Sequence, residues 1–300
     1  MSENVITSYK GFDKNMECLG FKYEVGKEYE MDGEIKCCNR GFHACKSPIE
    51  VWDYYDMLNS RFAEVEQSGK IDEEEKSTKI CSSRIKIKAE LKLADIINIG
   101  VEWLKDITSP SKIKEDGVLN DNGYRRKQIG SSGYYAKIGS SGDSAKIGSS
   151  GKSAKIGSSG KSAQIGSSGD YAQIGSSGDS AQIGSSGDYS KIGSSGDSAK
   201  IGSSGDYAQI GSLGDYAQIG SSGNSAKIDS TGEDSVIMCA GNESKAKAKV
   251  GSWITLAEWK WSDEKNRNVP VCVKTEYVDG ENIKADTWYQ LKNGKFEVNE

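Results

Sequence analysis

The most regular feature of the chain is a nine-residue pattern of hydrophobic and polar positions between Ile129 and Ile228. Isoleucine recurs at every ninth position of this stretch, in the consensus I-G-S-S-G-(D/K)-(S/Y)-A-(K/Q). Within each unit, (S/Y)-A-(K/Q)-I alternates polar and apolar residues, which is the period of a strand buried on one face. The remainder, G-S-S-G-D, predicts a turn in which glycine takes positive φ. A short repeat of strand and turn predicts a parallel β-solenoid.

One variable position predicts how this chain coils. Tyr135, Tyr171, Tyr189 and Tyr207 are separated by multiples of 18 residues, and Tyr216 stands in an alternate unit, where Ser is otherwise found. We therefore expect 18 residues per coil, with two nonapeptides that contribute to two short sheets. The twelve units would make about six coils.

The segment before the repeat predicts an N-terminal α+β domain. Its Ser-Pro-Ile-Glu motif at 47–50 has the pattern of a helix N-cap with a capping-box Glu, so a helix is expected over 48–55. Apolar spacing of three and four predicts a second helix over 93–107. Residues 71–78 are expected to form a solvated loop. The expected strands cover residues 20–25, 33–38, 61–67 and 79–87.

The segment after the repeat predicts an antiparallel β cap. Residues 234–251 continue a degraded repeat, and residues 252–261, 269–278 and 288–298 have strand patterns. Asn293-Gly294 is a two-residue hairpin signal. The fold class expected is therefore mainly β: an α+β domain (1–110), a polar joint (111–128), a β-solenoid (129–251) and a β cap (252–300).

Composition and charge narrow the functional classes. The net charge is −5, and the repeat block carries eight Lys and seven Asp, so nucleic-acid binding is not favoured. We expect no membrane span, because no apolar run approaches about 18 residues. The polar start MSENVITSYKGFDKN predicts no signal peptide. Seven cysteines, an odd number with one adjacent pair, favour reduced thiols in a cytosol.

The tyrosine positions of the repeat are the main candidate binding site. Exposed phenol rings on one flat face, interleaved with Lys137, Lys155 and Lys191, could dock a macromolecule. The alternative is that the rings stack only to stiffen the solenoid. An exposed tyrosine face or an uncapped sheet edge could also mediate a homodimer. The candidate residues are Tyr135, Tyr171, Tyr189, Tyr207 and Tyr216.

Two groups of residues have the types of a metal site, and each also has a structural interpretation. The single histidine, His43, lies near Cys37, Cys38 and Cys45, which are suitable zinc ligands by type. Adjacent cysteines on a strand point to opposite faces and no CxxC is present, so buried thiols without a metal are expected. The repeat also has the length of the calcium-binding nonapeptide, but Lys152, where other units have Asp, would disfavour a dication. No cofactor is expected. The Asp residues concerned are 170, 179, 188, 197, 206 and 215.

The non-repetitive segments resemble a known family. GFKYEVGKEYEMDGEIKCCNRGFHACKSPIEVWDYY, RFAEVEQSGKI, SSRIKIKAEL and GSWITLAEW are similar to bacteriophage and prophage proteins of Gram-positive hosts. In those proteins an N-terminal domain with a GFHAC core precedes tandem short repeats. The resemblance implies a phage-encoded protein in the host cytoplasm. It does not point to any particular enzymatic activity.

The function expected is therefore non-enzymatic: a rigid solenoid that engages a host or phage protein, as in the inhibition of a host defence system. One alternative is an enzyme, because GFHACKSPIEVWDYY and AEVEQSG are distantly similar to ADP-ribosyltransferases, although the other motifs of that family are not found. Another alternative is a structural virion component. A site in the N-terminal domain would lie around 41–55, with His43, Cys45, Tyr54 and Tyr55 as its candidate residues.

Overall fold

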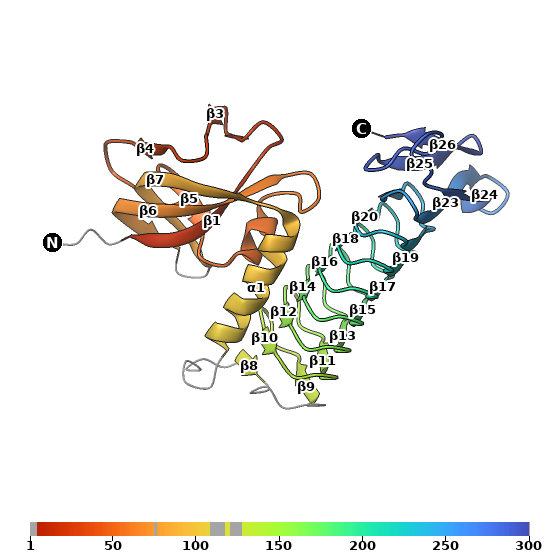
Figure 1. Ribbon diagram of the computed structural model, residues 1–300, viewed down its shortest axis with the longest axis horizontal. Coiled ribbons are helices and arrows are strands. Elements are labelled where there is room, and N and C mark those ends of the chain that lie inside the picture. The colour runs from red at the N-terminus through yellow and green to blue at the C-terminus, as the bar shows by residue number, and fades with distance from the viewer. Residues whose placement is uncertain (1–4, 75–76, 109–117, 121–127, 300) are drawn as a thin grey trace. The chain divides into compact units, whose positions relative to one another are not determined.

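The computed structural model describes residues 5–74, 77–108, 118–120 and 128–299 (Figure 1). The chain divides into two compact units, Met1–Trp103 and Leu104–Glu300. Strands make up most of the regular structure, and α1 (Leu93–Ile107) is the only α-helix among these residues. The mainly β fold class is therefore confirmed, as is the helix expected over 93–107. No helix in the described ranges is long and apolar enough to cross a membrane.

The N-terminal unit is built on an antiparallel sheet with the strand order β4-β7-β5-β1-β6. Strand β7 also pairs with β6, so that β7, β5, β1 and β6 close into a ring. Phe12, Phe42, Val65 and Ile85 are buried in its core. The strands are β1 Ile6–Phe12, β4 Glu28–Glu30, β5 Phe42–Cys45, β6 Arg61–Glu73 and β7 Lys79–Leu91, with a separate pair β2 Glu17–Cys18 and β3 Phe21–Lys22.

Of the four strands expected in this unit, two are present. A third forms only in part, and the fourth does not form. The segments 61–67 and 79–87 lie in β6 and β7, and β6 continues through Ile71–Glu73, which were expected to be loop. Of the strand expected over 20–25, only β3 forms. Residues 33–38 form no strand, because positive φ at Gly33 and Cys38 turns the chain. A single bridge between Lys36 and Arg40 closes that turn.

The helix expected over 48–55 is a short 3₁₀-helix, η1 (Ile49–Asp53). No side chain caps its start. The Glu50 carboxylate instead accepts hydrogen bonds from the backbone N–H and the hydroxyl of Thr78, at 2.9 and 2.5 Å. Its expected capping-box role was therefore wrong. The apolar side chains of η1 are nevertheless buried, and Trp52 is 0% exposed.

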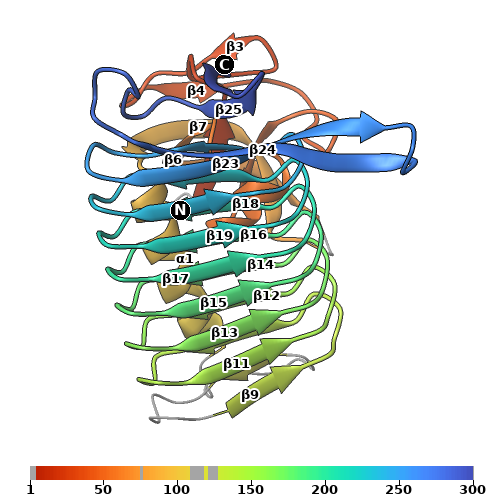
Figure 2. The same cartoon turned by 90° about the vertical axis from the view of Figure 1, so that its right-hand side faces the viewer.

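The second unit is a parallel β-solenoid with 18 residues per coil, as predicted (Figure 2). Ile138 pairs with Ile156 in one sheet and Ile147 pairs with Ile165 in the other, so successive nonapeptides alternate between two sheets. The degraded repeat continues the pairing into β21 and β22 and extends the solenoid to about seven coils.

The repeat strands of both sheets are four residues long, from β9 to β21, whereas β23 and β24 are longer. The ten-stranded sheet contains β8 Val118–Asn120, β10 Lys137–Ser140, β12 Lys155–Ser158, β14 Gln173–Ser176, β16 Lys191–Ser194, β18 Gln209–Ser212, β20 Lys227–Ser230, β22 Lys245–Lys247, β25 Tyr289–Lys292 and β26 Lys295–Val298. The nine-stranded sheet contains β9 Gln128–Ser131, β11 Lys146–Ser149, β13 Gln164–Ser167, β15 Gln182–Ser185, β17 Lys200–Ser203, β19 Gln218–Ser221, β21 Val236–Cys239, β23 Trp253–Ser262 and β24 Arg267–Tyr277.

The position of the strand within the repeat differs from the prediction. The strand is (K/Q)-I-G-S, two residues later than expected, and the Ser/Tyr position lies in the turn with positive φ, for example 57° at Ser180 and 56° at Tyr189. The second glycine of each unit does not have positive φ. A Cβ on Gly187 would lie 2.2 Å from the carbonyl oxygen of Gly169, one coil earlier. These glycines are required for close contact between coils.

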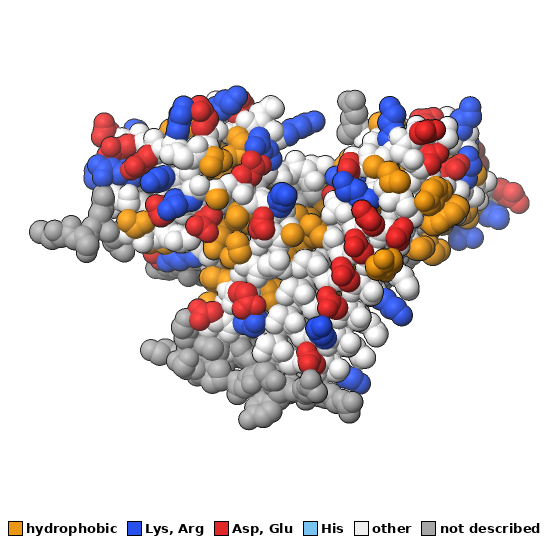
Figure 3. All heavy atoms as spheres, in the orientation of Figure 1, with side chains coloured by type: hydrophobic (Ala, Val, Ile, Leu, Met, Phe, Trp, Pro, Cys, Tyr) orange, Lys and Arg blue, Asp and Glu red, His pale blue; other side chains and the backbone are white. Residues whose placement is uncertain are grey.

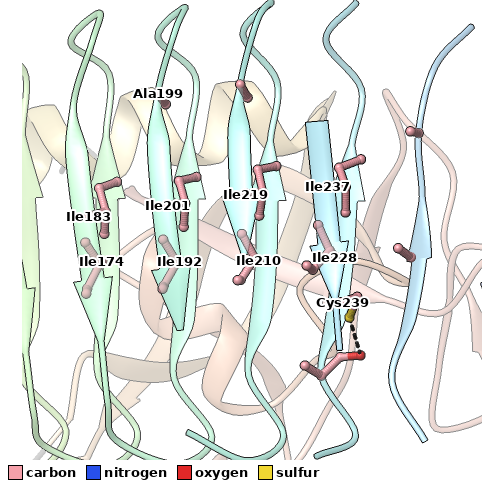
Figure 4. Close-up of a cluster of buried hydrophobic side chains, with 14 of the residues drawn as sticks. Ile174, Ile183, Ile192, Ala199, Ile201, Ile210, Ile219, Ile228, Ile237 and Cys239 are labelled. Atoms are coloured by element: carbon pink, nitrogen blue, oxygen red, sulfur yellow. Dashed lines mark hydrogen bonds between the residues drawn. The ribbon is translucent and has the colours of Figure 1, made fainter. Parts of the chain in front are cut away.

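Isoleucine and alanine fill the interior of the solenoid (Figure 4). Side chains such as Ile192 and Ile201 come from opposite sheets and are 0% and 3% exposed. Burial of each isoleucine contributes roughly 1.5–3 kcal/mol. Because the same side chain returns every coil, the core is a continuous column.

Antiparallel strands complete both sheets at the C-terminal end, as predicted. Strand β23 pairs in parallel with β21 and antiparallel with β24. The hairpin β25–β26 turns at Asn293 and Gly294, which both have positive φ, as a two-residue hairpin requires. Pairing of Ala246 with Tyr289 joins this hairpin to the ten-stranded sheet.

Candidate functional site

The outer face of the nine-stranded sheet has a floor of glycine. In its repeat strands, from β9 to β19, the first and third residues point outward, and the third residue is glycine. Around Gly148, Gly184, Gly202 and Gly220 no atom lies within 4 Å of the position that a Cβ would take. These glycines line a shallow groove. It crosses β11, β13, β15, β17 and β19, the strands that face the viewer in Figure 2. An extended partner could therefore approach the backbone of the sheet closely.

Two polar columns border this glycine floor. One is formed by the first residue of each strand, where glutamine predominates, and the other by serine at the start of the following turn. The polar groups of the groove are mainly amides and hydroxyls, and its charges are few. The residues are Gln128, Lys146, Gln164, Gln182, Lys200 and Gln218 on one side, and Ser168, Ser186, Ser204 and Ser222 on the other.

An apolar ledge, formed by Val236, Met238, Trp253 and Tyr277, lies at the C-terminal end of this face. All four side chains are 42–53% exposed, and the rings of Trp253 and Tyr277 are 5.1 Å apart between centroids. Our sequence interpretation missed this ledge. Its signal is the degraded unit V-I-M-C, which places large side chains where earlier units have Gln or Lys and Gly.

Three of the predicted tyrosines form a stack beside the serine column. Tyr171, Tyr189 and Tyr207 lie in the turns that leave the nine-stranded sheet, and neighbouring rings are parallel within 5°, with centroids 5.1 and 4.8 Å apart. Each ring remains 42–49% exposed. The predicted tyrosine row therefore exists, but it follows a column of turns and not the flat face of a strand.

The other two predicted tyrosines lie outside this stack. Tyr135 is separated from Tyr171 by the coil that carries Ser153, and Tyr216 lies in a turn that enters the nine-stranded sheet, on the opposite side of the coil. Both are strongly exposed. The cation over the stack is Lys152, with its Nζ 5.1 Å from the Tyr171 ring centroid. The lysines expected there begin strands of the ten-stranded sheet: Lys137 in β10, Lys155 in β12 and Lys191 in β16.

The aspartates of the repeat connect successive coils. The Asp188 carboxylate accepts a hydrogen bond of 2.8 Å from the backbone N–H of Asp206, one coil later, and the Asp206 carboxylate accepts one of 2.7 Å from Asn224. A row of acidic side chains along the solenoid is visible in Figure 3. The same bonding is found at Asp170, Asp179, Asp197 and Asp215. These carboxylates thus have a structural use that needs no calcium.

The four candidate residues of the N-terminal domain line one cavity of about 1320 Å³. They are His43 and Cys45 in β5, and Tyr54 and Tyr55 just after η1. The cavity therefore brings together all the residues predicted for this site. Burial raises the pKa of both tyrosine hydroxyls, so they are proton donors at neutral pH.

Two residues that the sequence interpretation missed lie in the same cavity. Lys10, in β1, is 4% exposed and donates a hydrogen bond of 2.9 Å to the carbonyl of His43. Its Nζ lies 3.5 Å from Cys18 Sγ, which is 2.9 Å from the Tyr55 hydroxyl. Burial lowers the pKa of Lys10, while the nearby Cys18 opposes this shift. The sequence gave no signal of this burial, because lysine is rarely buried and β1 has no alternating pattern that marks an inner face.

Two thiols and an imidazole form a cluster, but its members are not all those that the sequence suggested as zinc ligands. The ligand atoms of Cys37, His43 and Cys81 lie within 4.8 Å of one another, whereas Cys38 and Cys45 are not part of the group. The backbone N–H of Cys38 donates to His43 Nε2 at 2.9 Å. Burial raises the pKa of Cys81 to about 12, and the Cys37 pKa is also raised by burial, so both thiols hold their protons.

One comparison with known proteins gives a match. Residues 6–99 match the family model of a domain of unknown function (DUF7666). No curated protein and no solved structure shows significant similarity to the chain. The match covers the antiparallel sheet and the cavity of the N-terminal unit. The chain therefore carries an N-terminal DUF7666 domain that is followed by a β-solenoid.

Proposed function

We propose that this protein is a non-enzymatic binding protein whose solenoid holds a partner protein on the outer face of the nine-stranded sheet. The observation that carries the proposal is the exposed stack of Tyr171, Tyr189 and Tyr207 beside a groove with a glycine floor. Tyrosine is enriched among residues that dominate the energy of protein interfaces. The repeat holds these rings at a fixed spacing, so little conformational entropy is lost on binding.

A protein partner fits the chemistry of this surface better than a nucleic acid does. The polar groups of the groove are mainly amides and hydroxyls, which pair with peptide groups. The apolar ledge at Met238 and Trp253 offers an anchor for a hydrophobic side chain. A nucleic-acid groove would need a run of cations. The expected setting, the cytoplasm of a phage-infected cell with a defence protein as target, is supported only by the resemblance to phage proteins.

Capture of a partner from nuclease-treated bacterial lysate tests the proposal. The full chain is compared with a variant in which Tyr171, Tyr189 and Tyr207 are all changed to Ser. We expect the wild type to retain a protein that the variant loses. The variant should fold, because Ser180 has the same positive φ in the equivalent turn of the other column.

The control variant is Tyr216→Ser, which removes an exposed tyrosine from the opposite turn. It should keep the partner. Retention by the triple variant, or failure of the wild type to retain any protein, would contradict the proposal. Cooperative thermal melting of all three proteins shows whether a lost partner reflects a lost surface.

A further inference from the structure

The cavity of the N-terminal domain contains a buried cation that has no acidic partner. The Lys10 ammonium group donates to the His43 carbonyl and lies next to Cys18 Sγ. In the part of the chain that the structure describes, no carboxylate oxygen lies within 4.0 Å of it. Buried charges in proteins are normally paired, because an isolated charge loses its hydration without compensation. The cavity therefore favours an anion beside Lys10.

Two aromatic rings that pack against each other, with centroids 5.2 Å apart, lie beside this cation. The Lys10 Nζ lies 5.6 and 5.5 Å from the ring centroids of Phe12 and Tyr23. Tyr23 in turn packs edge-on against Phe21, and their centroids are 4.8 Å apart. On the other side, Cys18 connects Lys10 to the hydroxyl of Tyr55. An aromatic wall with a cation beside it is complementary to a planar ring that carries an acidic group.

Among the acidic side chains that line the cavity, Asp13 and Glu30 are exposed and are engaged by other groups. Asp13 accepts hydrogen bonds from the backbone N–H groups of Asn15 and Glu17. Glu30 forms an ion pair of 2.8 Å with Arg84. Water screens these carboxylates, whereas Lys10 lies where screening is weak. The electrostatic preference deep in the cavity is therefore set by Lys10.

We propose that the N-terminal cavity binds a small planar aromatic acid, whose carboxylate or phosphate pairs with Lys10 and whose ring packs among the surrounding aromatic side chains. The cavity volume of about 1320 Å³ is ample for such a molecule. This site is independent of the solenoid surface, so either can fail without the other.

Isothermal titration calorimetry on the full chain tests the proposal with a matched pair of probes. Naphthoate has a planar ring and a carboxylate, and naphthamide has the same ring without the charge. We expect naphthoate to bind the wild type at least about tenfold more tightly than naphthamide, because a charge-assisted hydrogen bond in a buried site discriminates by that much. Equal affinity for the two probes, or no binding of either, would overturn the proposal.

Two lysine variants locate the site. Lys10→Met keeps the length of the side chain but removes the charge, and it should abolish the preference for naphthoate. Lys14→Met removes an exposed lysine of the same cavity and should preserve the preference. If Lys10→Met kept the preference, the acid would bind elsewhere and the proposal would be wrong. Thermal melting verifies that Lys10→Met folds; if it does not, the comparison of the two probes on the wild type and on Lys14→Met decides.

Discussion

At the scale of single residues, the two glycines of each nonapeptide have different tasks. The glycine in the strand of the nine-stranded sheet faces open space, as at Gly184. The glycine in the turn, such as Gly187, lies against the backbone of the preceding coil. The same residue type therefore serves an exposed surface in one place and close packing in the other. Sequence alone does not separate these tasks, because both positions are invariant within this chain's regular units.

The two glycines should respond very differently to one added methyl group. Gly187→Ala would place a Cβ 2.2 Å from the Gly169 oxygen, so the coils must separate, and we expect a loss of about 1–3 kcal/mol in the free energy of unfolding. Gly184→Ala meets no atom and should change stability by less than about 1 kcal/mol. Urea unfolding followed by circular dichroism measures both. Equal losses in the two variants would contradict the assignment of these tasks.

At the scale of elements, the coil length was predictable and the strand position was not. The spacing of the tyrosines shows which units lie in the same column, because a side chain repeats only when the chain returns to the same sheet. The position of the strand depends on the left-handed conformation at Ser180 and Tyr189, which is unusual for residues other than glycine. Polar and apolar residues also alternate in this turn. The pattern therefore predicted a strand that begins two residues before the observed one.

Deletion of whole coils tests the element scale. Removal of residues 146–163, one complete coil, keeps every later strand in its own sheet, and Ala145 then joins Gln164. We expect cooperative melting, with Tyr135 now adjacent to Tyr171 in the stack. Removal of residues 146–154, half a coil, exchanges the sheets of all later units relative to β9 and β10. Strand β13, whose outer residues are exposed, then takes the place of β12, whose outer residues are buried.

The half-coil variant should therefore melt at a lower temperature and less cooperatively than the full-coil variant. The comparison is matched, because both deletions remove the same kind of sequence and the shorter one would otherwise be the milder change. If the two variants melted alike, the sheets would be interchangeable and the 18-residue coil would not be the structural unit.

At the scale of the whole molecule, the chain combines two different kinds of candidate site. The solenoid offers a long exposed face, and the DUF7666 domain offers a cavity that is open to solvent on one side. The tyrosine stack could be predicted because it follows from a repeat. Lys10 and Cys18 could not, because their meeting with Tyr55 depends on the closed sheet and on contacts between residues far apart in sequence.

The C-terminal strands complete both sheets at one end of the solenoid. Strand β23 joins the parallel sheet to β24, and the hairpin β25–β26 does the same for the other sheet. An exposed edge of a parallel sheet would otherwise pair with another chain. Binding of a partner to the face of the solenoid is then favoured over end-to-end pairing of its sheets with those of another chain. The expected homodimer stays a prediction.

The central claim is that the outer face of the nine-stranded sheet holds the partner, and a glycine of its floor tests this most directly. Gly184→Arg places a long side chain in the groove, where no atom lies within 4 Å of the new Cβ, so the fold should be kept. Surface plasmon resonance with the captured partner compares this variant with the wild type. We predict at least a tenfold loss of affinity with an unchanged melting temperature. Unchanged affinity in a folded Gly184→Arg protein would contradict the account and place the partner on another surface.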